Sequence, residues 1–82
     1  MSGALASYRK ALSIRESLAA RDANNAEWQR DLIVSLWRIG TASEDKTYFK
    51  RALDIAESLK QSGKLAPADA WMVDKLKQMA AQ

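Results

Sequence analysis

The polar and apolar residues of this chain follow the period of an α-helix in four segments. Apolar side chains recur three or four positions apart, so each segment has one apolar face and one polar face. Glycine and proline, which interrupt helices, occur only at Gly3, Gly40, Gly63 and Pro67. The chain is therefore predicted to be all-α, with helices over about residues 4–22, 26–42, 45–62 and 67–80.

The ends of these segments carry residues that begin and stop helices. Asn24 is predicted to end the first helix in the left-handed conformation, and Asn25 to cap the second. Gly63 suits the end of the third helix, and Pro67 suits the first turn of the fourth. Gly40 has two interpretations: a close-packing position inside the second helix, which we favour, or the residue that ends it.

One phrase of the sequence occurs twice. Residues 8–18, YRKALSIRESL, return 41 positions later as residues 49–59, FKRALDIAESL. A second, shorter similarity follows each copy: Trp28 corresponds to Trp71 at an offset of 43. Self-similarity with a period of about 20 to 50 residues indicates stacked repeats. Because the loops between the amphipathic segments are short, neighbouring helices are expected to be antiparallel, giving helical hairpins stacked side by side as a short α-solenoid.

These residues resemble a tetratricopeptide repeat (TPR) protein of the long-helix type found in bacteria. Ile39-Gly40 takes the Leu-Gly place of a repeat's first helix. Tyr48 or Phe49 supplies the aromatic residue of the second helix, and Ala52 and Leu53 supply its Ala-Leu pair. The connection after Gly40 is several residues shorter than is usual in such repeats. The resemblance implies one domain at the C-terminal end of an array. In it, residues 4–22 are the second helix of a preceding repeat, 26–62 a shortened full repeat and 67–80 a capping helix.

Composition narrows the classes of function. The net charge of +3 comes from 13 basic and 10 acidic residues that are mixed along the chain, so a concentrated nucleic-acid patch is not expected. The chain has neither cysteine nor histidine. Both residues are common metal ligands; cysteine is also a common nucleophile, and histidine the commonest general base. We therefore expect no enzymatic activity, no metal and no cofactor. No apolar run is long enough to span a membrane, and a cytoplasmic location is expected.

The resemblance also implies a binding site. In TPR proteins the first helix of each repeat lines a groove that holds an extended peptide or a partner helix. Carried onto this sequence, and extended to the fourth helix by the 43-residue offset, the groove residues are Arg30, Val34, Trp37, Arg38, Thr41, Val73 and Lys77. Tryptophan beside arginine and lysine is typical of binding hot spots. Alternatively, Trp37 packs beneath a neighbouring repeat or is simply half-buried.

The implied function is a non-catalytic protein-interaction module. Two alternatives are a small basic nucleic-acid-binding domain and a structural element that only caps or oligomerises a larger repeat protein. Trp28 and Trp71 are predicted to be core anchors, because each opens an apolar stripe or its edge.

The first helix has an apolar face about half its circumference wide and lacks a hairpin partner of its own. We therefore predict self-association through that face, which carries Leu5, Tyr8, Leu12 and Arg15. Arg15 lies in the middle of this apolar arc, where the second copy of the phrase has Ala56. It is expected to lay its aliphatic stem on apolar surface and keep its charge in water.

Overall fold

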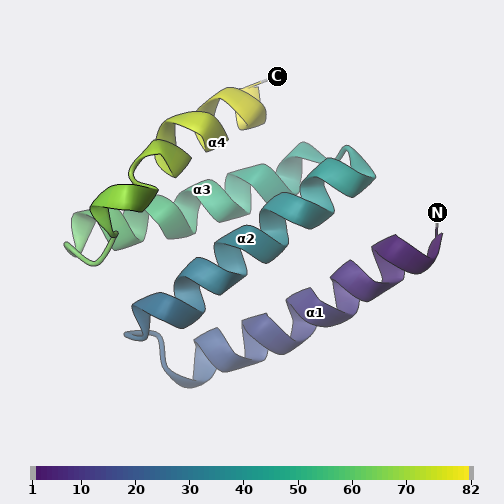
Figure 1. Cartoon of the computed structure of the whole chain (residues 1–82), viewed down its shortest axis with the longest axis horizontal. Coiled ribbons are helices and arrows are strands. Elements are labelled where there is room, and N and C mark those ends of the chain that lie inside the picture. The colour runs from purple at the N-terminus through teal and green to yellow at the C-terminus, as the bar shows by residue number, and fades with distance from the viewer. Residues whose placement is uncertain (1, 82) are drawn as a thin grey trace.

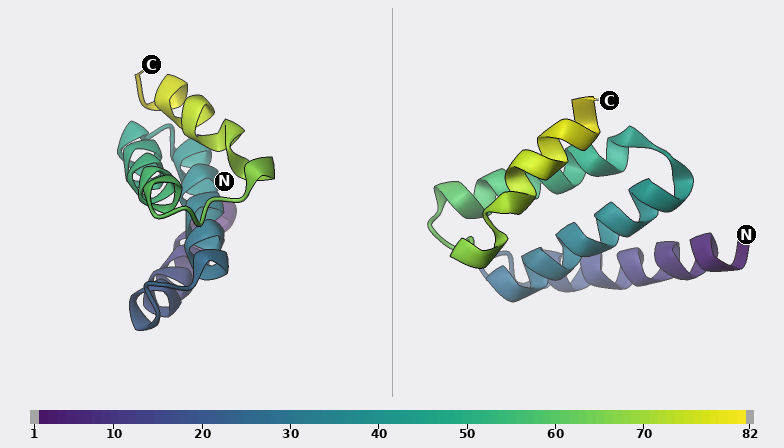
Figure 2. Two further views of the ribbon diagram at one scale, coloured as in Figure 1. Left: turned by 90° about the vertical axis from the view of Figure 1, so that its left-hand side faces the viewer. Right: turned by 45° about the horizontal axis from the view of Figure 1, so that its top comes forward.

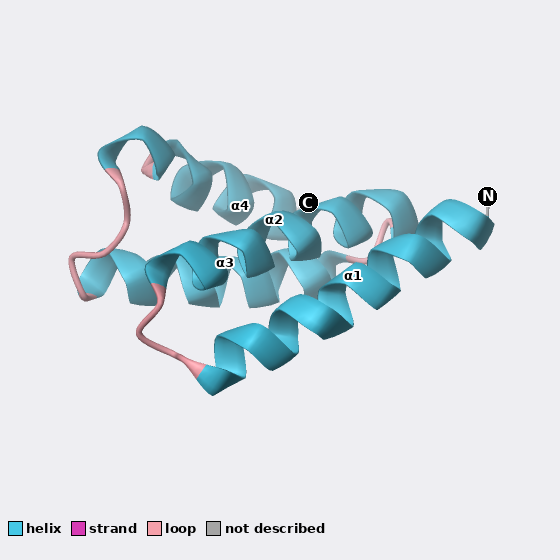
Figure 3. Ribbon diagram, turned by 60° about the horizontal axis from the view of Figure 1, so that its bottom comes forward, coloured by secondary structure: helices cyan, strands magenta, loops and turns pink. Residues whose placement is uncertain are grey.

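The structure is a computed structural model that describes residues 2–81. Within this range the chain forms four α-helices and no strand: α1 (Ser2–Arg21), α2 (Ala26–Ser43), α3 (Lys46–Gln61) and α4 (Trp71–Ala81). Consecutive helices run antiparallel and are joined by short loops (Figures 1 and 3). The prediction of an all-α chain is confirmed, with helix boundaries close to those expected except at the start of α4.

The α1–α2 connection begins α2 as predicted but ends α1 differently. The side chain of Asn25 accepts a hydrogen bond from the backbone N–H of Trp28 at 3.1 Å, which caps α2. Asn24 does not adopt the left-handed conformation that we predicted. Instead, Asp22 closes the turn, because its carboxylate accepts from the Asn24 N–H and its carbonyl accepts from the Asn25 N–H. The left-handed residue lies one loop later, at Glu44 (φ 56°), whose N–H donates to the carbonyl of Gly40.

Gly40 lies inside α2 and is buried, which confirms the interpretation we favoured. A Cβ atom at this position would lie 3.0 Å from Cε1 of Phe49 on α3. The absence of a side chain therefore lets the aromatic ring lie directly against the backbone of α2. This contact sets how closely the two helices of the α2–α3 hairpin approach each other.

Both ends of α3 follow from local chemistry. The Asp45 carboxylate accepts hydrogen bonds from the backbone N–H and the hydroxyl of Thr47, and these two bonds lower the pKa of Asp45. Gly63 adopts φ 74° just beyond the helix, as predicted.

The fourth helical segment differs from its prediction. We expected one helix from Pro67, but Pro67–Asp69 form a separate 3₁₀-helix and α4 begins at Trp71. The N–H groups of Asp69 and Ala70 donate to the carbonyls of Ala66 and Pro67, which is the i→i+3 pattern of a 3₁₀-helix. This short element changes the direction of the chain before α4, which packs on α3 (Figure 2).

The helices pack in chain order. Backbone contacts join α1 to α2, α2 to α3 and α3 to α4, with α1 at one edge of the molecule and α4 at the other (Figure 1). The largest fully buried side chains come from α2 and α4: Ile33, Leu36, Ile39 and Leu76. Packing of each element against its neighbours in sequence is how repeat proteins build a continuous core. No helix in residues 2–81 is long and apolar enough to cross a membrane.

Candidate partner-binding groove

A groove of about 260 Å³ opens between α2 and α4. Four α2 residues line it. The last three follow the first by four, seven and eight positions, which places all four on one face of that helix. The first two residues of α4 complete the lining: the residues are Arg30, Val34, Trp37, Arg38, Trp71 and Met72. No backbone contact joins α2 to α4, so these two helices meet only through their side chains.

Two tryptophans face each other across this groove. The ring centroids of Trp37 and Trp71 are 5.6 Å apart and the ring planes are inclined at 58°, a tilted arrangement typical of favourable aromatic pairs. Trp37 is half-buried and packs on the core, whereas Trp71 is 58% exposed. The buried Met72 and the half-buried Val34 also line the groove. Trp71 therefore presents most of the aromatic surface that the groove exposes to solvent.

One arginine of the groove, Arg30, forms an ion pair with Asp69 of the 3₁₀-helix. Arg30 Nε lies 2.7 Å from Asp69 Oδ2, and Arg30 Nη2 donates to Asp69 Oδ1 at 3.2 Å. Asp69 is buried, so the two hydrogen bonds satisfy a carboxylate that has lost much of its water. The hydrogen bond to Asp69, and then its negative charge, raise the pKa of Arg30. Because Trp71 follows Asp69 by two residues, this ion pair also positions the ring of Trp71 beside α2.

Arg38 is the other arginine of the groove. In the part of the chain that the structure describes, the ion pairs join Arg30 to Asp69 and Arg51 to Glu16, so Arg38 takes part in neither. Its side chain is exposed and adjoins the Trp37–Trp71 pair. The groove therefore combines an aromatic surface with a guanidinium group that has no carboxylate partner among residues 2–81.

The structure brings together four of the seven predicted groove residues: Arg30, Val34, Trp37 and Arg38. Thr41 is exposed, but its hydroxyl donates to the carbonyl of Trp37 at 2.9 Å and it does not line the groove. Val73 is buried, and with Lys77 it lines a separate hollow beside α3. The 43-residue offset fails on α4 because Met72, Val73 and Leu76 form the buried face of that helix, and Trp71 lies off this face and is exposed.

Two groove features were missed. Trp71, predicted to be a core anchor, is exposed, so that prediction is wrong. Its position 100° from Met72 on the helix already places it off the centre of the apolar stripe. Asp69 was not singled out at all, since an acidic residue in a helix's first turn has an ordinary explanation as a dipole partner. Trp28, the other predicted anchor, is half-buried.

The predicted self-association face is divided by the structure. Leu12 is 5% exposed and belongs to the core formed with α2, so it is not available as a surface residue. Leu5 is half-buried against the same core, and Arg15 is half-buried. Tyr8 remains 36% exposed. The apolar arc of α1 is thus centred on α2, and only its flank is uncovered.

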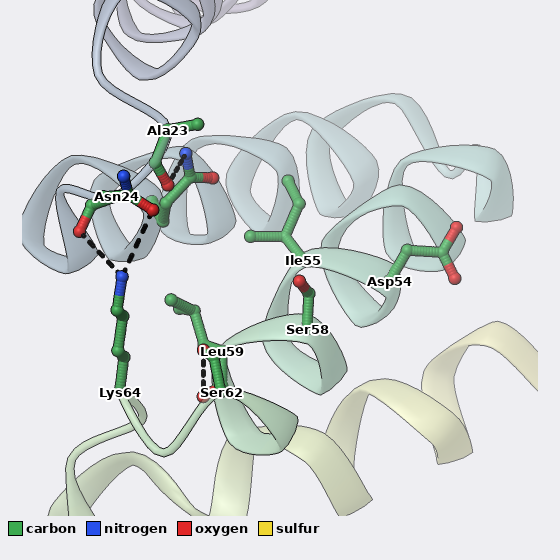
Figure 4. Close-up of a pocket in the computed structure, with 9 residues that line it drawn as sticks. Ala23, Asn24, Asp54, Ile55, Ser58, Leu59, Ser62 and Lys64 are labelled. Atoms are coloured by element: carbon green, nitrogen blue, oxygen red, sulfur yellow. Dashed lines mark hydrogen bonds between the residues drawn. The ribbon is translucent and has the colours of Figure 1, made fainter.

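A larger hollow of about 420 Å³ lies between the α1–α2 loop, α3 and the loop after α3 (Figure 4). Its polar groups are largely used within the chain. Lys64 Nζ donates to the backbone carbonyl and the side-chain oxygen of Asn24, each at 3.4 Å. Gln29 Nε2 donates to the carbonyls of Ala19 and Ala23, also at 3.4 Å. The bonds from Lys64 join the α1–α2 loop to the loop after α3, and Asp54 lies at the far end of the hollow from Lys64 (Figure 4).

Within residues 2–81 the structure gathers no group of three or more acidic side chains that could hold a metal ion. Comparison of the chain with protein-family models, with curated proteins and with solved structures found no match.

Proposed function

We propose that this protein is an interaction module of TPR type that binds a segment of another polypeptide in the groove between α2 and α4. The observation that carries the proposal is the Trp37–Trp71 pair, in which Trp71 is exposed, beside Arg38, which has no carboxylate partner among residues 2–81. Large aromatic side chains flanked by arginine supply most of the binding energy in many protein interfaces.

The arrangement of the helices supports the TPR assignment. In that family the first helix of each repeat faces the groove, and here α2 and the beginning of α4, which take those places, provide the whole lining. The Gly40–Phe49 contact lies at the Leu-Gly and aromatic positions that suggested the family. Packing restricted to consecutive helices is also the pattern of a repeat protein.

The lining indicates the chemistry of the ligand. An apolar side chain fits against Trp37, Trp71 and Val34, where it displaces water from aromatic surface. A carboxylate a few ångströms away can form paired hydrogen bonds with the planar guanidinium of Arg38. The expected ligand is therefore a peptide segment that carries a large apolar residue close to an aspartate or glutamate.

Selection from a phage-displayed library of random peptides on the immobilised protein tests this proposal. Selected peptides should be enriched in large apolar residues next to acidic ones, and should lose binding to Trp71→Ala and Arg38→Ala. Arg9→Ala, which removes an exposed arginine on α1, is the matched control and should bind as the unaltered protein does. Peptides that bind equally well to Trp71→Ala and Arg38→Ala would show that the groove is not the site.

A further inference from the structure

One side of α1 carries a mostly apolar stripe that α2 leaves uncovered. Its members recur three and four positions apart, so they form one line along the helix. This line lies roughly 100° around the helix from Leu12 and Ala19, the residues that α1 buries. We call this set the α1 stripe: Ala4, Ser7, Ala11, Ile14 and Leu18. Ile14 is 54% exposed, and α1 lies at the edge of the molecule opposite α4 (Figures 1 and 3).

Positive charges border the α1 stripe on both sides. Arg15 lies between the stripe and the face packed on α2, and Lys10 lies on the outer side of the stripe. Neither side chain takes part in an ion pair within residues 2–81. Glu16, the one acidic residue of α1, lies on the opposite side of the helix. Arg21 and Asp22, at the end of the stripe, offset each other in charge, so the stripe carries a net positive border.

The duplicated phrase shows what a cation at the position of Lys10 binds when another helix is present. Lys10 corresponds, 41 residues later, to Arg51 of α3. The Nη2 atom of Arg51 lies 2.6 Å from Oε2 of Glu16, which belongs to α1. A neighbouring helix therefore supplies a carboxylate to this position in α3, and the same position in α1 is without one among residues 2–81.

The same comparison shows that the α1 stripe has the composition of a covered helix face. Ala11 and Leu18 correspond to Ala52 and Leu59 of α3, which are 0% and 6% exposed. Ala11 and Leu18 are only half-buried. The difference follows from the neighbours, since α3 lies between α2 and α4, whereas α2 is the only helix of residues 2–81 whose backbone contacts α1.

Arg15 adds a second requirement for a carboxylate. It stands where α3 has Ala56, which is fully buried. A helix laid on the α1 stripe would remove more of the guanidinium of Arg15 from water. That loss of hydration has a high cost unless the covering helix supplies a charged hydrogen-bond acceptor.

We infer that the α1 stripe is a docking site for an amphipathic helix of another polypeptide, with glutamate or aspartate residues on both borders of its apolar face. The small side chains of Ala4, Ser7 and Ala11 allow helix axes to approach to about 8–10 Å. Ile14 and Leu18 supply the apolar contact. Charges that border a stripe of this spacing select the partner helix, and here Lys10 and Arg15 select acidic residues.

Charge and shape argue against two other occupants. A second α1 helix would bring Lys10 and Arg15 against the same two cations, because bordering positions meet bordering positions in a helix pair. A membrane surface is favoured by tryptophan, phenylalanine and leucine on the apolar face. The α1 stripe instead begins with alanine and serine, and its one large exposed side chain is that of Ile14.

Two synthetic helical peptides of about three heptads test the inference. They share a leucine stripe and differ only at its bordering positions, which are glutamate in one peptide and lysine in the other. The glutamate peptide should shift the backbone amide NMR signals of the α1 stripe in the isotope-labelled protein. It should bind there at least about tenfold more tightly than the lysine peptide, because each bordering contact changes from attraction to repulsion.

The indole signals of Trp37 and Trp71 distinguish this site from the groove between α2 and α4. Trp71→Ala should leave the binding of the glutamate peptide to α1 unchanged, so the inference does not depend on the proposed function. Equal affinities for the two peptides, or shifts confined to the two indole signals, would overturn it. Binding to vesicles that contain phosphatidylserine in preference to the glutamate peptide would also overturn it.

Charge reversal on α1 provides a matched pair of variants. Lys10→Glu should weaken binding of the glutamate peptide about tenfold, because it replaces an attractive contact by a repulsive one. Arg9→Glu makes the same change one residue away, on the side of α1 that faces away from the stripe, and should leave the affinity nearly unchanged. Ile14→Ser should weaken binding about tenfold without a change of charge. Equal affinities of Lys10→Glu and Arg9→Glu would contradict the inference.

Discussion

The guanidinium of Arg30 and the carboxylate of Asp69, 39 residues apart in sequence, form two hydrogen bonds between α2 and the 3₁₀-helix before α4. The Asp69 side chain is 12% exposed, whereas that of Arg30 is 48% exposed. The pair is therefore screened by water on one side only. It is the connection that sets the start of α4, and with it the place of Trp71, against α2.

Removing either partner should destabilise the protein. We expect Arg30→Ala to lower the free energy of unfolding by about 1–2 kcal/mol, between the values for exposed and buried ion pairs, because it leaves Asp69 without its charged partner. A double-mutant cycle with Asp69→Ala, followed by urea unfolding, should give a coupling energy of about 1 kcal/mol. Additive effects of the two substitutions would mean that the pair contributes no energy of its own.

Gly40→Ala tests the close contact between α2 and α3. Alanine normally stabilises a helix interior by about 1 kcal/mol relative to glycine. Here the new methyl group would lie 3.0 Å from the Phe49 ring, and overpacking of this kind costs about 1–3 kcal/mol. We therefore expect a net loss of stability in thermal unfolding. In a protein that already carries Phe49→Leu, Gly40→Ala should instead increase stability. If Gly40→Ala increased stability with Phe49 still present, the ring would be free to move out of the way.

The two groove tryptophans should differ in their effect on stability. Trp71→Ala should cost less than about 1 kcal/mol, because the ring is largely exposed. Trp37→Ala should cost about 2 kcal/mol, because this ring also packs against the core. Urea unfolding followed by circular dichroism measures both without relying on tryptophan fluorescence. If Trp71→Ala were the more damaging change, Trp71 would be a structural residue.

Asp45 predicts an acid-sensitive contribution to stability. Its pKa is lower in the folded protein than in the unfolded chain, because Thr47 donates hydrogen bonds to the carboxylate. The stabilisation is therefore complete above the ordinary aspartate pKa of about 3.9, and is lost as the pH falls through the lower, folded-state value. Asp45→Asn keeps a capping oxygen but does not titrate. Urea unfolding at neutral and at acidic pH measures this difference. On acidification, the free energy of unfolding should fall more for the unaltered protein than for Asp45→Asn; equal decreases would show that the Asp45 carboxylate does not stabilise the folded state.

Local chemistry predicted most of the fold. Asn25, Gly40 and Gly63 each lie where their backbone or capping preferences place them, because those preferences act within a few residues. Asn24 and Glu44 show the limit of such rules. The two hydrogen bonds that Asp22 accepts from the N–H groups of Asn24 and Asn25 close the turn without a left-handed Asn24. In the short α2–α3 connection it is a glutamate, Glu44, that takes the left-handed conformation.

The candidate groove could be predicted on α2 but not on α4. The face of α2 follows from one helical period, which holds over the whole helix. The face of α4 depends on the turn at Pro67–Asp69 and on the ion pair with Arg30, neither of which has a periodic signal. For the same reason the 43-residue offset assigned Val73 to the groove and Trp71 to the core. In the structure Val73 is buried in the core and Trp71 is exposed in the groove.

The most direct test of the central claim is a titration of the isotope-labelled protein with a selected peptide, followed through the indole N–H signals of Trp28, Trp37 and Trp71 by NMR. Trp28 lies nine residues before Trp37 on α2, on the opposite face of that helix, and does not line the groove. Peptide binding should shift the Trp37 and Trp71 signals and leave that of Trp28 in place. Binding that moves Trp28 alone, or none of the three signals, would contradict the account.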